Sequence, residues 1–109
     1  MGVFAVGDVV LIPFPYADFS TFKKRPALVV GIAEFDNLIL CQITSKAITS
    51  KKAIKLVAAD FLKGSLNIES YIRPDKLFTV EKSVIEGVLG SLKTETVEVV
   101  QSAIRQLFT

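Results

Sequence analysis

The chain has 109 residues, half of them hydrophobic and 22% charged, so it has room for one domain with a compact core and none for a second. It contains no His and one Cys, Cys41, within an apolar run, which excludes the common zinc sites and an intrachain disulfide and indicates a core residue. Neither 18 consecutive apolar residues nor a secretion signal occurs, so we expect one cytoplasmic domain over residues 1–109, with no membrane span, metal or cofactor.

The first half of the chain predicts three strands joined by short links. Gly7–Tyr16 is an apolar run that opens with a Gly-Asp turn signal and closes with prolines, and both of its faces are apolar. A polar loop follows as far as Arg25. Pro26 has no backbone N–H to donate to a neighbouring strand, so we expect it to lie at the start of the second strand, Ala27–Ile32. Leu38–Thr44 is the third strand, and the short links favour an antiparallel meander.

The second half predicts further short strands. Ala53–Val57 alternates weakly as a strand, and the letters "AADFLKG" predict one helical turn that ends at Gly64. Two more strands, Ser70–Arg73 and Leu77–Val80, flank a Pro-Asp-Lys turn. Ile85–Leu89 supplies another strand after a brief turn.

One long helix is predicted at the end of the chain, from about Thr94 to Phe108, with Thr94 as its N-terminal cap. Its apolar residues follow at steps of three and four, in the stripe Val97, Val100, Ile104 and Leu107. Such a stripe is typical of a helix that packs on a sheet. The predicted fold is therefore mainly β, a small and strongly bent β-barrel with a C-terminal helix.

The net charge is only +2, but the charges are unevenly distributed. Seven Lys or Arg and two carboxylates lie between Ser20 and Leu56, whereas the rest of the chain carries six Lys or Arg and nine carboxylates. A concentration of positive charge on one face favours a polyanionic partner. The alternative is a set of solvated loops.

Two segments bring charge to the ends of strands. In "KKRPALVV", Arg25 directly precedes a proline-started strand that would hold its guanidinium in place. In "YIRPDKL", Pro74 stiffens the turn between Arg73 and Asp75, and alternation places these two side chains on the same side of an extended segment. Such a pair is able to face one phosphodiester, although an Arg-Pro-Asp turn is also compatible with a purely structural salt bridge. The Ile-Thr-Ser-Lys sequence at 43–46 is likewise compatible with a plain hydroxyl-rich loop.

Five stretches resemble the PemK/MazF family of toxin endoribonucleases from type II toxin-antitoxin systems, and they follow in the expected order over nearly the whole chain: "GDVVLIPFPY", "KKRPALVV", "LCQITSK", "SYIRPDKLFTV" and "GSLKTETVEVVQSAIRQLF". The resemblance implies an SH3-like barrel and a homodimer that cuts single-stranded messenger RNA at short sequences without a metal. It also implies a cognate antitoxin as partner, through which alone the toxin would reach DNA.

The resemblance further implies two catalytic sets, and this chain keeps both. The residues of the MazF branch fall on Arg25 and Thr44, and those of the PemK/Kid branch on Arg73 and Asp75. Some relatives carry a His or a Glu in the loop before Arg-Pro, where this chain has Ser20, Thr21 and Phe22 in sequence before its cations.

RNA cleavage by the 2′-hydroxyl of the RNA needs a base, an acid and positive charge near the pentavalent phosphate. Because the chain has no His, imidazoles are not available for proton transfer. We expect Arg25 to stabilise the phosphate with its planar fork and Thr44 to hydrogen-bond the same phosphate. Asp75 is then the candidate base, with Arg73 orienting it or facing the leaving oxygen. The products would be a 2′,3′-cyclic phosphate and a 5′-hydroxyl.

A further group of residues is predicted to contact the RNA outside the reaction centre, by charge, hydrogen bonding or stacking: Phe22, Lys23, Lys24, Ser45, Lys46, Lys51 and Lys52. If about three phosphates were neutralised, the log-log dependence of RNA affinity on salt would have a slope of roughly −2. Two other functions stay open at this point: a non-catalytic binding module of the same barrel type, and a toxin-derived subunit of a DNA-bound autorepressor.

Overall fold

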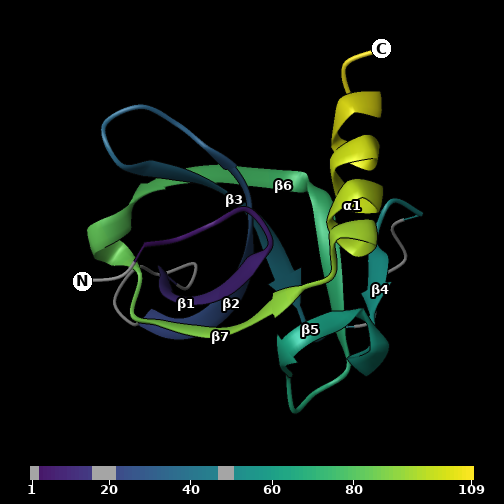
Figure 1. Cartoon of the computed structure of the whole chain (residues 1–109), viewed down its shortest axis with the longest axis horizontal. Coiled ribbons are helices and arrows are strands. Elements are labelled where there is room, and N and C mark those ends of the chain that lie inside the picture. The colour runs from purple at the N-terminus through teal and green to yellow at the C-terminus, as the bar shows by residue number, and fades with distance from the viewer. Residues whose placement is uncertain (1–2, 16–21, 47–50) are drawn as a thin grey trace.

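The computed structural model describes residues 3–15, 22–46 and 51–109, and within these ranges seven strands form one antiparallel sheet in the order β4-β6-β3-β2-β1-β7-β5. The strands are β1 (Asp8–Pro15), β2 (Phe22–Ile32), β3 (Asn37–Thr44), β4 (Ile54–Leu56), β5 (Phe61–Gly64), β6 (Ser70–Glu81) and β7 (Gly87–Leu92). Two 3-10 turns, η1 (Ala58–Asp60) and η2 (Lys82–Val84), and the helix α1 (Thr94–Gln106) complete the fold. The sheet is curled, with α1 beside β6 (Figure 1), so the predicted bent β architecture with a terminal helix is confirmed.

The curl gives β2 a hydrophobic cluster on each of its faces. The first core contains Val9, Leu28, Val30, Cys41, Ile43, Leu56, Ile72, Leu92, Val97 and Val100. The second core contains Val10, Ile12, Ala27, Val29, Leu38 and Leu40. Since successive residues of a strand point to opposite faces, a strand covered on both sides needs an unbroken apolar run, which is what "ALVV" supplies.

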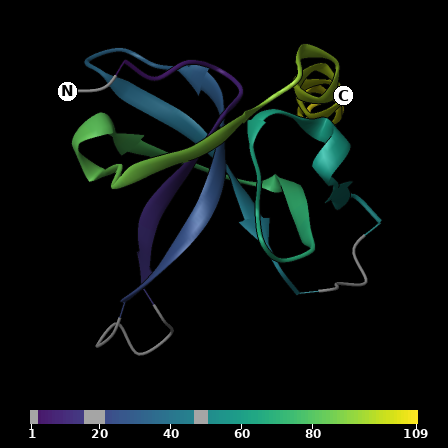
Figure 2. The same ribbon diagram turned by 60° about the horizontal axis from the view of Figure 1, so that its bottom comes forward.

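Helix α1 covers the first core. Val97 and Val100 are buried there, as the predicted stripe requires, and the side-chain amide of Gln101 donates a 3.0 Å hydrogen bond to the carbonyl of Val30 in β2. Figure 2 shows α1 end-on, beside the teal part of the chain that holds β4 and β5. The ends of β1 and β2 that lead toward residues 16–21 extend away from the helix.

Asp60 fixes the start of α1. Its carbonyl accepts a 2.9 Å hydrogen bond from the backbone of Lys93, and its carboxylate accepts a 3.1 Å hydrogen bond from the hydroxyl of Thr96. The prediction of Thr94 as N-cap is wrong, because Lys93 occupies that position without a side-chain cap and Thr94 is already helical. A carboxylate distant in sequence thus helps to order the first turn of α1, and no local sequence pattern indicates this contact.

Strand β2 begins earlier than the sequence indicated. It pairs with β1 from Phe22 opposite Pro15 onward, so the prediction of a polar loop reaching Arg25 is wrong for residues 22–25. Pro26 lies inside the strand. It is tolerated because the ladder with β3 starts only at Ala27, which leaves Pro26 paired with β1 on one side. Tyr16 lies outside the described residues.

Strand β6 is continuous where two strands and a turn were predicted. Cys41 of β3 lies opposite Leu77, and the next residue, Gln42, lies opposite Arg73. Residues 74–76 are therefore extra on β6 and form a bulge, which we call the Pro-Asp-Lys bulge. The turn-forming residues 74–76 produce a bulge and do not reverse the chain direction, because β3 pairs with β6 on both sides of the bulge.

The segment after β4 is also corrected. A 3-10 turn covers only Ala58–Asp60, and the predicted cap Gly64 ends a strand, β5, that pairs with β7. Gly64 has φ of 72°, and a Cβ there would collide with the carbonyl of Leu89 and with Gly90. Glycine is required here because the backbones of β5 and β7 approach each other closely, and it does not mark the end of a helix. The strand expected at Ile85–Leu89 is β7, displaced to Gly87–Leu92.

Candidate functional site

The four predicted catalytic residues lie on three adjacent strands, Arg25 on β2, Thr44 on β3, and Arg73 and Asp75 on β6. Gln42 of β3 pairs with Ala27 of β2 on one side and with Arg73 of β6 on the other, so these three side chains share the face of the sheet that carries the second core. Two residues further along the strands, Arg25 and Thr44 return to the same face, with Arg25 opposite the buried Ile12 of β1. We call this row of polar side chains at the end of the second core the polar face.

The register sets the approximate spacing on the polar face. The recorded β2–β3 pairing begins at Ala27 opposite Gln42, and Arg25 and Thr44 each lie two residues beyond that pair at the same end of the two strands. Thr44 pairs with Tyr71, so Arg73 is its diagonal neighbour on β6 at about 7–8 Å.

Thr44 is buried, with 7% of its surface exposed. Its hydroxyl oxygen accepts a 3.2 Å hydrogen bond from the backbone N–H of Lys46, which fixes the turn at the end of β3. A hydroxyl that accepts one bond still carries a proton to donate. The Thr44 hydroxyl is therefore still able to donate a hydrogen bond.

Arg73 and Asp75 form an ion pair across the Pro-Asp-Lys bulge. The Nη2 of Arg73 donates a 3.2 Å hydrogen bond to Oδ2 of Asp75, which confirms that the two side chains lie on the same side. Partial burial acts to raise the pKa of Asp75, but the hydrogen bond from Arg73 and the charges of Arg73 and Lys76 outweigh it, so the pKa lies below its usual value. The Nε of Arg73 is buried and has no hydrogen-bond partner among the described residues.

Cys41 supports the backbone of this bulge. Its thiol donates a 2.8 Å hydrogen bond to the carbonyl of Arg73, at the point where the ladder between β3 and β6 loses its register. Burial, followed by the negative charge of Asp75, raises the pKa of the thiol to about 12. Cys41 is thus a buried core residue, as expected, and it also holds the residue that carries the guanidinium.

A hollow of about 260 Å³ borders Arg25. Lys23, Lys24 and Ser45, all predicted to contact RNA, line it together with Arg25, and Lys24 forms a 2.8 Å ion pair with Glu86. The hollow also has a wall that the sequence did not indicate, made of Leu66, Asn67, Ile68, Ser70 and Leu89. All five are uncharged: Leu66, Asn67 and Ile68 lie in the link between β5 and β6, Ser70 begins β6, and Leu89 lies in β7. No local pattern in the sequence marked them as a wall beside Arg25.

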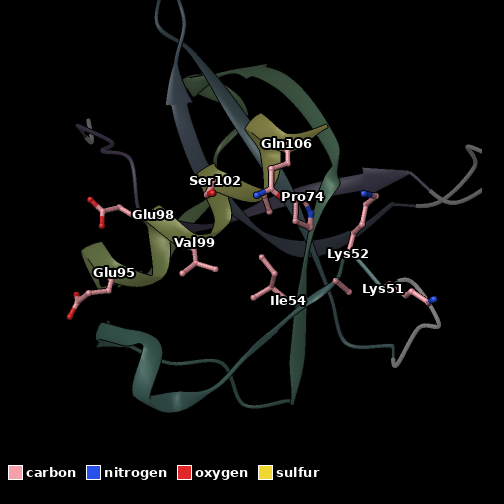
Figure 3. A pocket seen from close by; sticks show the side chains of 11 residues that line it. Lys51, Lys52, Ile54, Pro74, Glu95, Glu98, Val99, Ser102 and Gln106 are labelled. Carbon is pink, nitrogen blue, oxygen red and sulfur yellow. The ribbon is translucent and has the colours of Figure 1, made fainter. Parts of the chain in front are cut away.

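The remaining predicted contacts are spread more widely. Lys46 is exposed at the end of β3, whereas Lys51 and Lys52 lie on a different groove, between β4 and α1 (Figure 3). The side chain of Phe22 lies outside the described part of the molecule. The structure therefore brings Lys23, Lys24 and Ser45 to Arg25 and does not bring Lys51 and Lys52 into that hollow.

Two further properties concern the described residues alone. No three His, Cys, Asp or Glu side chains in the described ranges gather in a way that would hold a metal ion. None of the described helices is long and apolar enough to cross a membrane.

Residues 5–108 match the family model of the PemK-like, MazF-like toxin of type II toxin-antitoxin system. The chain belongs to this family. No curated protein sequence matches the chain significantly.

Solved structures of PemK/MazF-like toxins share the fold at low sequence identity. A MazE-MazF crystal structure from Deinococcus radiodurans has a TM-score of 0.79 and 22% identity, over 99% of this chain and 97% of that one. An endoribonuclease in complex with its cognate antitoxin, from a mycobacterial species, has a TM-score of 0.74 and 16% identity, over 99% and 95% of the two chains. The Mycobacterium tuberculosis toxin MazF-mt6 has a TM-score of 0.70 and 18% identity, over 93% and 95%.

Proposed function

We propose that this PemK/MazF-like toxin is an endoribonuclease that cuts single-stranded messenger RNA at short sequences, without a metal. The observation that carries the proposal is the polar face, where Arg25, Thr44 and Arg73 project from three adjacent strands. Arg25 also borders the hollow that Lys23 and Lys24 line on the first-core side of the same strands, which offers positive charge for the RNA backbone. The relatives described as endoribonucleases support the same activity.

Cleavage would proceed by attack of the 2′-oxygen on the adjacent phosphorus, with loss of the 5′-oxygen. Arg25 binds two non-bridging oxygens, and Thr44 donates a hydrogen bond to the same phosphate. A phosphate oxygen on the polar face would also give the buried Nε of Arg73 the acceptor that it lacks among the described residues. Three donors would thus stabilise the charge of the pentavalent phosphate.

Proton transfer in this scheme falls to Asp75. Its lowered pKa keeps the carboxylate ionised at neutral pH, so it is able to accept the proton of the 2′-hydroxyl, although as a weak base. The 5′-oxygen leaves next to the guanidinium of Arg73 and takes its proton from solvent water, and the protonated Asp75 returns its proton to solvent. The products are a 2′,3′-cyclic phosphate and a 5′-hydroxyl.

The same proposal includes the partners. Relatives crystallised as toxin-antitoxin complexes support a cognate antitoxin that inhibits the enzyme. We expect the toxin to act as a homodimer in the cytoplasm, where messenger RNA is found, and to reach DNA only through the antitoxin.

The test is incubation of the purified protein with a long RNA in EDTA, followed by sequencing of the ends. We expect cuts at one short sequence, with 2′,3′-cyclic phosphate and 5′-hydroxyl ends, and we expect Arg25→Ala to lower the rate by about 100-fold or more. Intact RNA from a folded wild-type protein that binds antitoxin tightly would show a binding module in place of an enzyme. Cuts that persist unchanged in Arg25→Ala would reject the assigned site.

A further inference from the structure

Gln42 lies in the middle of the polar face, on β3. It pairs with Ala27 of β2 on one side and with Arg73 of β6 on the other. Thr44 follows it on the same face, two residues further along β3. The side chain of Gln42 is therefore a direct neighbour of two groups that bind the phosphate in the proposed reaction, and none of the proposed steps uses its amide.

The fold does not use this amide either. Gln42 is half-buried, and its side chain makes no hydrogen bond within the part of the chain that the structure describes. Gln101 of α1 is also half-buried, but its amide donates to the carbonyl of Val30 and so ties the helix to the sheet. Removing an amide from water without a partner costs free energy, and the buried Leu40, two residues before Gln42, shows that this face accepts apolar side chains. The partner of the Gln42 amide is therefore expected outside the chain.

The group beside Gln42 is a guanidinium that is held in place. Asp75 accepts a 3.2 Å hydrogen bond from Nη2 of Arg73, and the thiol of Cys41 holds the carbonyl of the same arginine. Unpaired RNA bases are recognised by stacking on aromatic rings or guanidinium planes and by hydrogen bonds to their edges. An amide next to a fixed guanidinium supplies both kinds of contact.

The charged residues of the polar face do not supply a choice of sequence by themselves. Arg25 and Arg73 attract a phosphate, and every nucleotide carries the same phosphate. The hydroxyl of Thr44 is assigned to that phosphate too. Gln42 is the uncharged side chain among them with a donor and an acceptor side by side, and contacts of this kind distinguish one base edge from another.

We propose that Gln42 recognises the nucleobase beside the phosphate that is cut and so determines one position of the cleavage sequence. The assignment rests on the proposed ribonuclease activity and names a specificity residue within it. In a nucleotide, one sugar separates the base from its phosphate, and on β3 one strand repeat of about 7 Å separates Gln42 from Thr44. The amide donates one hydrogen bond to the edge of the base and accepts another from it.

The experiment uses a pool of single-stranded RNAs randomised around the cleavage sequence, with sequencing of the ends made by the wild type, Gln42→Met and Gln42→Glu. Met has nearly the length of Gln and no amide, so discrimination should fall by about 10-fold or more at one position and stay unchanged at the others. An ionised Glu only accepts hydrogen bonds. At the same position it should favour the bases with an amino group on the edge, adenine and cytosine, over uracil.

Asn67→Leu is the matched control, because Asn67 carries the amide of the hollow beside Arg25 on the other side of the sheet. It should keep the sequence preference of the wild type. Urea unfolding is a second readout: Gln42→Met should unfold at the same or a higher urea concentration, since it removes a half-buried polar group that the fold does not pair.

Each other outcome has a separate meaning. Gln42 variants that cut with the wild-type preference would overturn the assignment alone, and a changed preference in Asn67→Leu only would place base recognition in the hollow. A folded Gln42→Met that cuts no RNA would give Gln42 a catalytic role and overturn recognition as its task. A wild type that cuts no RNA would overturn the ribonuclease and the assignment together.

Discussion

At the scale of single residues, Cys41 shows how the core and the candidate site are joined. A bulge removes backbone groups from a ladder, and an unpaired buried carbonyl costs about 1–3 kcal/mol. Here the thiol of Cys41 donates to the carbonyl of Arg73, so a core side chain satisfies the backbone of a predicted catalytic residue. The sequence indicated that Cys41 is buried. The hydrogen bond could not be predicted from any local pattern, because it depends on the register of two strands more than 30 positions apart in the chain.

The thiol of Cys41 is expected to be inert in the folded protein. It is fully buried, and its pKa is raised to about 12, so almost none of it is thiolate at neutral or mildly alkaline pH. Iodoacetamide at pH of about 8 should leave the native protein unlabelled and modify it within minutes in denaturant, as mass spectrometry will show. Rapid labelling of the native protein would mean that the bulge opens readily.

The ion pair of Asp75 predicts a pH dependence of stability. Because the pKa of Asp75 is lower in the folded state, its contribution is fully present above the ordinary value of 3.8 and is lost as the pH falls through the lowered one. The side chains are 21% and 32% exposed, so solvent weakens the pair, and we expect Asp75→Asn to lower the free energy of unfolding at pH 7 by about 1 kcal/mol or less.

Urea unfolding of the wild type and Asp75→Asn at several pH values is the measurement. The difference between the two proteins should shrink as the pH falls below 3.8. Asp36→Asn is a suitable control, since Asp36 pairs with Lys82 at a longer 3.6 Å and is 74% exposed. A difference that grows toward acid pH would contradict the lowered pKa.

At the scale of secondary-structure elements, the sequence located the strands better than their ends. Apolar runs such as Val9 to Ile12 and Leu38 to Ile43 predicted buried strands because burial itself demands them. Lys23 and Lys24 suggested a loop, yet β2 continues there, because a hairpin outside the core tolerates charged residues. The Pro-Asp-Lys segment carries a turn signal that the fold uses as a bulge, which only the pairing with β3 decides.

The close approach of β5 and β7 gives a test at this scale. A Cβ on Gly90 would collide with the carbonyl of Lys63, whereas a Cβ on Gly87, in the same strand, meets nothing within 4 Å. We expect Gly90→Ala to lower the free energy of unfolding by about 1–3 kcal/mol, and Gly87→Ala to change it by no more than about 0.5 kcal/mol. Denaturant unfolding of both variants checks this, and equal effects would show that the two strands do not approach so closely.

At the scale of the whole molecule, most of the positive charges concentrated between Ser20 and Leu56 lie on two separate surfaces. Lys23, Lys24 and Arg25 border the small hollow on the first-core side of β2, while Lys51 and Lys52 lie on the groove between β4 and α1 together with Glu95 and Glu98. The four predicted catalytic residues were visible as local motifs. Strand register puts Arg25, Thr44 and Arg73 on one face, and Asp75 is placed by its hydrogen bond to Arg73. The uncharged wall of Leu66, Asn67, Ile68, Ser70 and Leu89 was missed because tertiary folding alone brings it to Arg25.

The division of roles among the three cations is tested most directly by single-turnover cleavage and binding of one RNA, measured for wild type, Lys23→Ala, Lys24→Ala and Arg25→Lys. Neutralising either lysine should weaken binding and flatten the salt dependence, whose log-log slope we expect near −2, while the bound RNA is cut at nearly the normal rate. Arg25→Lys should bind RNA with similar affinity and lose most of the cleavage rate, because a lysine has no planar fork for two phosphate oxygens. Equal losses of rate in all three variants would contradict a catalytic role that belongs to Arg25 alone.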